Sequence, residues 1–231
     1  MRAYWWCGRP NFGDRLTPLL LEYFSNVTVV HTGPMQAEVF VVGSILEQFW
    51  QGTVIGTGKT WEHLSFPQHK ADIRALRGPL TAKGVKGSYA LGDCGLLAPE
   101  LLDGTEEPET LYEVGVMPHY ADGDLEHQPE FAGAHIIRTT ADPLETIREI
   151  RRCKTLVTSS LHGAIVADAW GIPRRLESCP ATRLTGLFKF RDHACAVGLP
   201  FELGTTQSPS RAVIEGLQSG LRAALGGFRG G

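Results

Sequence analysis

The sequence predicts an α/β fold built from two Rossmann-like domains, each with a parallel sheet. Short apolar runs rich in β-branched residues alternate with amphipathic runs along almost the whole chain, an order typical of parallel sheets wound with helices. These strand candidates are too many for one compact sheet. A polar, turn-rich stretch at 102–113, LDGTEEPETLYE, divides them into two groups. We therefore place the domains at residues 1–112 and 113–225, followed by a glycine-rich, disordered tail at 226–231.

Each expected element rests on its local pattern of apolar residues. Strands are expected where short apolar runs occur, at 3–7, 27–31, 39–42, 53–55, 73–76, 88–91, 113–117, 135–137, 155–158 and 174–177. Helices are expected where apolar residues recur at helical spacing after a turn, at 14–24, 79–83, 95–102, 143–153, 161–170, 185–197 and 208–225.

The composition narrows the class of protein. With 231 residues, of which 42% are hydrophobic, the chain is long enough to form packed cores and to be an enzyme. The net charge is -3 and no run of five basic residues occurs, so we expect no nucleic-acid partner. The five cysteines form no CxxC pair, which favours a reducing cytoplasm over a disulfide framework. No apolar stretch approaches the roughly 20 residues of a membrane span, so we expect a soluble, cytoplasmic protein with at most peripheral membrane contact.

The first candidate site follows the strand expected at 3–7. Asn11 and Gly13 form a tight turn there, and Asp14 precedes the amphipathic run LTPLLLEYF, whose helix it can cap. Such a turn lies at the carboxyl edge of a parallel sheet, where binding residues concentrate. A binding role for Asn11 or Asp14 and a purely structural role are equally open.

Two glycine-containing turns lie further along the first domain. The segment GTGKT at 56–60 is not a phosphate-binding P-loop, because the required glycine is replaced by Thr53. We interpret it as a turn that closely approaches a ligand or the facing domain. In RGPLT, Gly78 and Pro79 open a short helix, and Arg77 at its start opposes the helix dipole unless an anion compensates. That pattern favours an anion-binding site at Arg77.

The second domain contributes two histidines at strand ends. His119 closes the strand expected at 113–117, and a histidine in that position more often contacts nearby backbone than takes part in catalysis. The segment TLVTSSLHGAIVADAWGIP at 155–173 is more informative. Ser159 and Ser160 supply hydroxyls that can cap the helix that follows the strand, so His162 lies in its first turn, where free N–H groups favour anions. We therefore expect His162 at the ligand-binding edge of the second sheet.

Several catalytic motifs are missing from the sequence. No GxGxxG opens a helix, so a dinucleotide cofactor is not expected. No GxSxG elbow surrounds Ser160, which argues against a hydrolase nucleophile. The histidines lack the spacing of metal ligands, so we expect no bound metal.

Taken in order, NFGDRLTPLLL, VIGTG, RGPLT, ALGDCGLL, VGVMPHY and VTSSLHGAIVADAWGIP resemble the polysaccharide pyruvyl transferase family, over about residues 4–199. The resemblance implies a fold similar to GT-B glycosyltransferases, with the active site in a cleft between the two Rossmann-like domains. It also implies that the pyruvyl group of phosphoenolpyruvate is transferred to sugar hydroxyls of a glycan or a lipid-linked sugar, giving a pyruvate ketal. Phosphoenolpyruvate is then the donor substrate, and no cofactor is implied.

The resemblance also suggests roles for individual residues. His162 matches the histidine proposed to act in catalysis, and Arg77 lies in the segment from which a basic residue contacts the donor. Ser160 and Gly163 lie in the donor-binding turn. We expect the helix N-terminus to lower the pKa of His162, so that the neutral imidazole can accept a proton from the sugar.

Two late basic residues and three turn residues complete the expected site. Lys189 and Arg191, in FKFRDHACAVGL, resemble late basic residues of the family, although a solvated helix face is the alternative. The remaining substrate-binding candidates are Asn11, Asp14 and His119.

Two other functions stay open at the level of sequence. A GT-B-type glycosyltransferase that uses a nucleotide sugar would need a ribose-binding carboxylate, for which Glu177 is the candidate. A catalytically silent glycan-binding protein would need an aromatic platform for sugars. Five tryptophans are candidates for it, although their apolar surroundings favour core packing: Trp5, Trp6, Trp50, Trp61 and Trp170.

Overall fold

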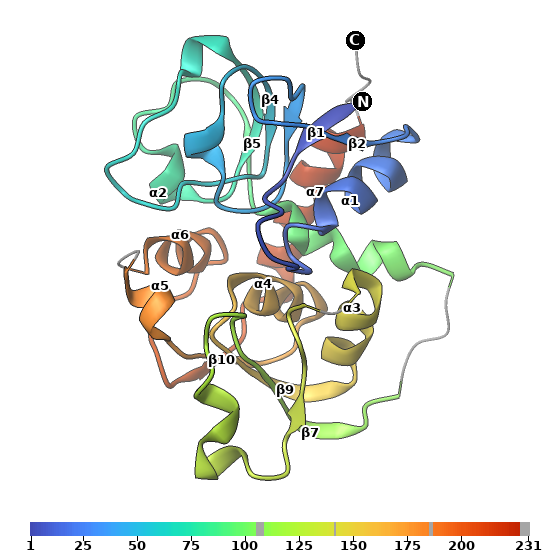
Figure 1. The fold of residues 1–231 in the computed structure, drawn as a ribbon, viewed down its shortest axis with the longest axis vertical. Coiled ribbons are helices and arrows are strands. Elements are labelled where there is room, and N and C mark those ends of the chain that lie inside the picture. The colour runs from blue at the N-terminus through green and yellow to red at the C-terminus, as the bar shows by residue number, and fades with distance from the viewer. Residues whose placement is uncertain (105–108, 141, 185–186, 227–231) are drawn as a thin grey trace.

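The structure, a computed structural model, describes residues 1–104, 109–140, 142–184 and 187–226. Two mostly parallel sheets with helices between their strands confirm the predicted α/β fold with two Rossmann-like domains. The first sheet lies in the upper half of Figure 1 and the second in the lower half. The finer likeness to GT-B enzymes stays a prediction.

In the described part of the chain the first sheet has six strands, all parallel, in the order β2-β1-β3-β4-β5-β6. They are β1 (Arg2–Tyr4), β2 (Val30–His31), β3 (Val39–Phe40), β4 (Gly52–Ile55), β5 (Ala71–Leu76) and β6 (Ala90–Leu91). Each lies within or beside a run that the sequence marks as a strand.

The second sheet has the order β11-β10-β9-β7-β8 among the described residues. Its strands are β7 (Tyr112–Met117), β8 (His135–Ile136), β9 (Cys153–Thr158), β10 (Arg174–Leu176) and β11 (Thr206–Gln207). The first four are parallel, whereas β11 pairs antiparallel with β10. The sequence does not reveal β11, because this two-residue edge strand is polar and partly exposed.

The α-helices follow the predicted order with shifted ends. They are α1 (Leu16–Ser25), α2 (Pro79–Ala82), α3 (Pro143–Arg151), α4 (Leu161–Trp170), α5 (Pro180–Leu184), α6 (Phe188–Ala196) and α7 (Arg211–Gly226). The segment expected as a helix at 95–102 is a 3-10 helix, η3 (Cys94–Leu102), and it has Pro99 inside it. The sequence reading missed the five-residue α5, and positions 185–186 of the helix expected at 185–197 lie outside the described residues.

Shorter 3-10 turns occupy several connections. They are η1 (Leu46–Gln48), η2 (Gln68–Lys70), η4 (Leu125–His127) and η5 (Pro129–Phe131).

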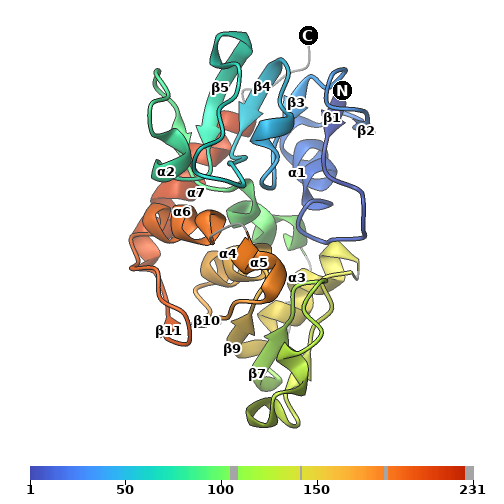
Figure 2. The same cartoon turned by 60° about the vertical axis from the view of Figure 1, so that its left-hand side comes forward.

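The two domains share a continuous core. Helix η3 contacts α1 and α7 beside the first sheet and α3 and α4 beside the second. Helix α7 follows the second sheet in the chain, yet it packs on β5 and β6 of the first sheet and lies beside α1 in Figures 1 and 2. One buried cluster therefore runs from Leu20 and Leu97 through to Ile165. The second sheet begins at Tyr112 in β7, and the domain boundary near that residue stays a prediction.

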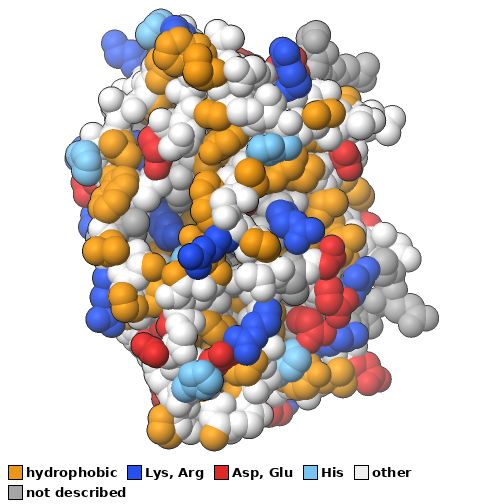
Figure 3. Space-filling view, in the orientation of Figure 1, with side chains coloured by type: hydrophobic (Ala, Val, Ile, Leu, Met, Phe, Trp, Pro, Cys, Tyr) orange, Lys and Arg blue, Asp and Glu red, His pale blue; other side chains and the backbone are white. Residues whose placement is uncertain are grey.

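The last described helix, α7, packs against the first domain. Gly226 ends α7, and the other residues of the predicted disordered tail, 227–231, lie outside the described residues. Basic, acidic and hydrophobic side chains are interspersed over the face shown in Figure 3.

Candidate active site

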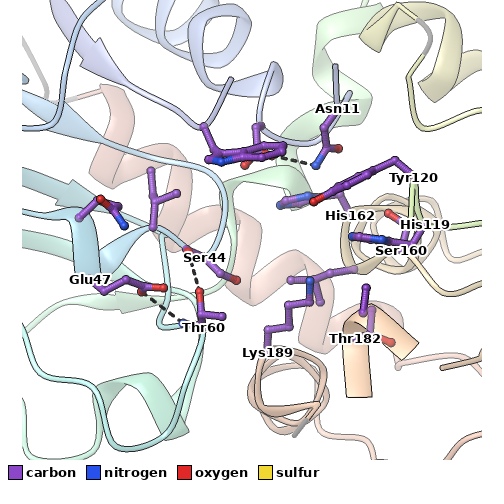
Figure 4. Close-up of a pocket in the computed structure, with 16 residues that line it drawn as sticks. Asn11, Ser44, Glu47, Thr60, His119, Tyr120, Ser160, His162, Thr182 and Lys189 are labelled. Atoms are coloured by element: carbon purple, nitrogen blue, oxygen red, sulfur yellow. Dashed lines mark hydrogen bonds between the residues drawn. The ribbon is translucent and has the colours of Figure 1, made fainter. Parts of the chain in front are cut away.

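A cavity of about 360 Å³ lies between the two domains, and both contribute to its wall. Its lining includes Trp6, Asn11, Asp14, Ser44, Glu47 and Thr60 from the first domain, and His119, Tyr120, Ser160, His162, Thr182 and Lys189 from the second (Figure 4). Except for Lys189, which comes from α6, these residues lie in segments that follow the carboxyl ends of strands. The cavity therefore occupies the edge where open α/β sheets bind ligands.

His162 is fixed in the first turn of α4. Ser160 is the N-cap of this helix, and its hydroxyl accepts a hydrogen bond from the Gly163 N–H at 3.5 Å, as the sequence predicts. The His162 side chain is buried, with 6% of the residue exposed. The ring edge that carries Nδ1 lies directly against Gly13, where an added Cβ would overlap the imidazole. A glycine is required in this loop because the first domain must approach His162 so closely.

A buried carboxylate faces the other ring nitrogen of His162. Nε2 lies 3.9 Å from Oδ2 of Asp93, and among the described residues neither atom has a hydrogen-bond partner. The second oxygen of Asp93, Oδ1, accepts the Gly95 N–H at 2.8 Å and caps η3. The sequence reading missed Asp93 as a site residue, because its helix-capping role gives no signal that its other oxygen faces a histidine.

Both histidines in the cavity are neutral near pH 7. Burial, and then the positive charge of Lys189, lower the pKa of His162 to about 3. The same two causes lower the pKa of His119 to about 4. The predicted direction for His162 is right, but burial is the largest cause of its lowered pKa. His119 also contacts backbone, as expected for a strand end: its Nδ1 accepts from the Ala121 N–H at 3.2 Å.

Asn11 and Asp14 form a pair in the cavity wall. Nδ2 of Asn11 donates to Oδ2 of Asp14 at 2.8 Å, a contact drawn in Figure 4. Asp14 does not cap α1, because the N-cap residue is Arg15 and no side chain caps that end. Burial raises the pKa of Asp14 to about 7, although the nearby Lys189 works in the opposite direction. The predicted helix-capping role of Asp14 is therefore wrong, and Asp14 lines the cavity instead.

The two late basic residues have different surroundings. Lys189 points from α6 into the cavity (Figure 4), where burial and the charge of Arg77 lower its pKa to about 8, so it stays mostly protonated at pH 7. Arg191 lies outside the cavity lining and pairs with Glu62 at 3.3 Å on the surface. Of the two, Lys189 supplies positive charge to the cavity, whereas Arg191 fits the solvated-face alternative.

Arg77 is buried behind the cavity rather than in its lining. Its guanidinium donates to Oδ2 of Asp192 at 2.9 Å and to the Lys59 carbonyl at 2.6 Å. Gly58, in the turn interpreted as a close approach, leaves room for this guanidinium, since an added Cβ would overlap it. The turn at 56–60 therefore approaches Arg77 of its own domain closely.

The start of α2 does bind an anion, but the anion belongs to the protein. Oδ1 of Asp192 accepts the N–H groups of Leu80 and Thr81, both at 2.9 Å, and the Thr81 hydroxyl donates to Oδ2. The local sequence RGPLT therefore indicates that the start of α2 can bind an anion. It does not indicate that α6 of the other domain supplies the carboxylate.

The remaining predicted residue, Gly163, is not in the cavity lining. An added Cβ there would overlap Met117 and Thr158, so this glycine allows α4 to pack closely on β7 and β9. The sequence reading also missed the wall formed by Ser44, Glu47 and Thr60. All three residues follow the carboxyl end of a strand, but many other polar loop residues do so as well, so this position alone does not single them out.

The described residues show no ligand set for a metal. Within them, no group of three or more His, Cys, Asp or Glu side chains is placed to hold an ion. No helix in the same part of the chain combines the length and apolar character needed to cross a membrane.

The contact between Gly13 and His162 gives a first testable expectation. In Gly13→Ala the new methyl group must displace the imidazole ring, so we expect the activity of this site to fall by about 100-fold or more. Gly123→Ala is the matched control, because no atom lies within 4 Å of its added Cβ. Steady-state kinetics of both variants check this expectation. Equal activity of the two would show that the position of the His162 ring does not matter.

Comparisons with known proteins agree with the geometry. The family model described as polysaccharide pyruvyl transferase matches residues 66–175. An uncharacterized protein of Acanthamoeba polyphaga mimivirus is 30% identical to this chain over 82% of this chain and 71% of its own length. The succinoglycan biosynthesis protein ExoV of Rhizobium meliloti (strain 1021) is 27% identical over 87% of this chain and 66% of its own length. No solved structure matches the chain at a significant level. The chain belongs to the polysaccharide pyruvyl transferase family.

Proposed function

We propose that this protein transfers the pyruvyl group of phosphoenolpyruvate to two hydroxyls of a sugar in a glycan, forming a pyruvate ketal. Family membership supports pyruvyl transfer, and the similarity to ExoV, a succinoglycan biosynthesis protein, supports a glycan acceptor. The observation that carries the proposal is the interdomain cavity, where His162 and Lys189 lie beside the N-terminus of α4. Phosphoenolpyruvate acts as a substrate in this proposal, and no cofactor is invoked.

The charges around the cavity suit this donor. Phosphoenolpyruvate carries a phosphate and a carboxylate, which require cations and N–H donors. Lys189 provides a cation in the lining, and Ser160 and His162 place the N-terminus of the ten-residue helix α4 in the same lining, where the first turn of a helix has N–H groups without intrahelical partners. Arg77 lies outside the cavity lining but affects it electrostatically. Its positive charge adds to burial in lowering the pKa values of both His162 and Lys189. We propose that Arg77 favours the anionic donor through this charge rather than by direct contact.

His162 is suited to remove a proton from the attacking sugar hydroxyl. It is neutral before the donor binds, and the negative charge of bound phosphoenolpyruvate then raises its affinity for a proton. We assign the Nε2–H tautomer, with the N–H directed at Asp93, which leaves Nδ1 on the opposite ring edge as the acceptor. As His162 gains a proton, the Asp93 carboxylate stabilises the imidazolium and holds the ring in place.

The proposed reaction has two additions at the same carbon. Protonation of the methylene carbon C3 gives C2 cationic character, and the oxygen of the first hydroxyl bonds to C2 as His162 takes its proton. The bond between C2 and the phosphate oxygen then breaks. The second hydroxyl adds to C2 and closes the ketal, and its proton leaves with the phosphate as hydrogen phosphate.

The two rival functions receive less support from the structure. Glu177 does not line the cavity, and its carboxylate pairs with Arg175 at 3.0 Å, so the ribose-binding group of a glycosyltransferase is not in place. Of the five tryptophans, Trp6 is the one in the cavity lining, and its face stacks on Tyr120 with ring centroids 5.8 Å apart. A single tryptophan in this position is a poor platform for glycan binding without catalysis.

Thermal-shift titration separates these functions. A ligand at about 100 times its dissociation constant stabilises the folded protein by about 2.7 kcal/mol, which is a measurable shift. We expect phosphoenolpyruvate to raise the melting temperature and UDP-sugars to leave it unchanged. A response to UDP-sugars together with no response to phosphoenolpyruvate would replace the proposal with a glycosyltransferase.

A further inference from the structure

The proposed reaction needs an acid that delivers a proton to the methylene carbon of the donor. We propose that the carboxyl group of Asp14 is that acid. This inference rests on the proposed function and goes beyond it, because it assigns the step that begins the reaction. Asp14 thereby becomes a catalytic residue that acts on C3 of phosphoenolpyruvate, opposite in role to the base His162.

The surroundings of Asp14 favour a carboxyl group that holds its proton. The residue is 6% exposed and lines the cavity, and among the described residues its carboxyl forms no ion pair. Oδ2 accepts a hydrogen bond from Asn11, while Oδ1 lies against the backbone of Gly43, where an added Cβ would be 2.6 Å away. A buried carboxylate without a paired cation is costly, so the neutral acid is favoured. The resulting pKa of about 7 allows Asp14 to donate a proton at neutral pH.

The charged and titratable groups around Asp14 come from several elements. Lys189 on α6 lowers the pKa of Asp14, and Asp93 at the start of η3 raises it. Two phenols lie close enough to be affected by its charge: burial is the main cause that raises the pKa values of Tyr4 and Tyr120, and the charge of Asp14 adds to it. Binding of the negatively charged donor raises the pKa of Asp14 further, so the acid stays protonated until the reaction begins.

The other titratable groups in the cavity suit different tasks. His119 and His162 are neutral near pH 7 because their pKa values are about 4 and 3. Lys189 is needed as a cation for the donor. Glu47 is half-buried, and its carboxylate accepts a hydrogen bond from the Thr60 N–H at 3.3 Å. Asp14 is the buried carboxyl of the lining whose pKa lies near neutral pH.

The protons balance over one turnover. The O–H bond of Asp14 breaks as the C3–H bond forms, which converts the methylene into a methyl group. The proton of the first sugar hydroxyl passes to His162, and the proton of the second leaves on hydrogen phosphate. The proton on His162 returns to Asp14 through water, which restores both groups without any oxidation or reduction.

The matched substitution is Asp14→Asn, which keeps the size of the side chain and an oxygen for Asn11. We expect it to retain phosphoenolpyruvate binding, measured by isothermal titration calorimetry, while the rate of pyruvyl transfer falls by about 100-fold or more. In the wild-type protein the rate should fall as the pH rises through the pKa of Asp14, and this dependence should disappear in the variant. Glu22→Gln is the control, because it makes the same chemical change at an exposed position of α1, the helix that follows Asp14.

A second readout follows the proton without the reaction. Because the folded state raises the pKa of Asp14, the carboxyl supports the fold when it is protonated and weakens it as the pH rises toward 7. The melting temperature of Asp14→Asn minus that of the wild type should therefore increase by about 4 °C or more when the pH is raised from 5 to 8. A difference in melting temperature that does not change with pH would overturn the assignment.

The outcomes distinguish this inference from the proposed function. A wild-type protein that transfers no pyruvyl group overturns both. Wild-type transfer combined with an Asp14→Asn rate within about threefold of it overturns only the role of Asp14, as does loss of donor binding in that variant. If Asp14→Asn does not fold, Asp14→Glu replaces it: a shifted pH dependence supports the assignment, and an unchanged one overturns it.

Discussion

The largest loss of activity is expected from replacing the base. His162→Gln should lower the rate of pyruvyl transfer by about 100- to 10,000-fold, because glutamine cannot take the proton of the attacking hydroxyl. Donor binding should survive, since Lys189 and the N-terminus of α4 remain. Single-turnover measurement of ketal formation, together with calorimetric titration of phosphoenolpyruvate, separates the two effects.

His69→Gln is the matched control for this experiment, because His69 is exposed in η2 of the first domain. It should keep the wild-type rate. A folded His162→Gln protein with full activity would remove His162 from the mechanism. A loss of donor binding as large as the loss of rate would assign the residue to binding instead.

The largest loss of stability is expected at the interdomain ion pair. Asp192→Ala leaves the fully buried guanidinium of Arg77 without its counter-charge and removes the acceptor for the N–H groups of Leu80 and Thr81. Breaking a buried pair from one side costs about 3–5 kcal/mol. Urea denaturation should therefore show a midpoint well below that of the wild type.

The neighbouring residue offers the control for this prediction. Arg191→Ala removes an ion pair with Glu62 whose two side chains are 41% and 60% exposed. A pair of this kind contributes at most about 1 kcal/mol, so the midpoint should change little. Equal losses from Asp192→Ala and Arg191→Ala would show that burial of the Arg77–Asp192 pair does not matter for stability.

Local patterns in the sequence predict most of the fold. The β9–α4 unit follows directly from a β-branched run, a serine cap and a terminal glycine, because each of these acts within a few residues. Strand β11 and helix α5 escape prediction, since such short elements depend on packing against distant segments. The return of α7 to the first sheet is equally invisible in local sequence.

In the candidate site, too, features set by local sequence can be predicted and features set by contacts between distant segments cannot. The position of His162 at a sheet edge can be predicted, because a strand and a capped helix determine it. The partner of Arg77 cannot, because Asp192 lies 115 residues away in sequence and looks like an ordinary charge on α6. Asp93 is similarly hidden, and only the packing of η3 on α4 brings its free oxygen toward His162. The proton affinity of Asp14 likewise depends on burial, which local sequence does not specify.

The most direct test of the central claim is to follow the fate of the donor. Phosphoenolpyruvate labelled with carbon-13 at C2 and C3 is incubated with the protein and a glycan acceptor, and the products are observed by NMR. We predict a ketal carbon and a methyl signal on the glycan, together with one hydrogen phosphate for each ketal. Unchanged phosphoenolpyruvate across a panel of glycan and lipid-linked acceptors, alongside sugar transfer from a nucleotide sugar, would contradict the assignment of this cavity to pyruvyl transfer.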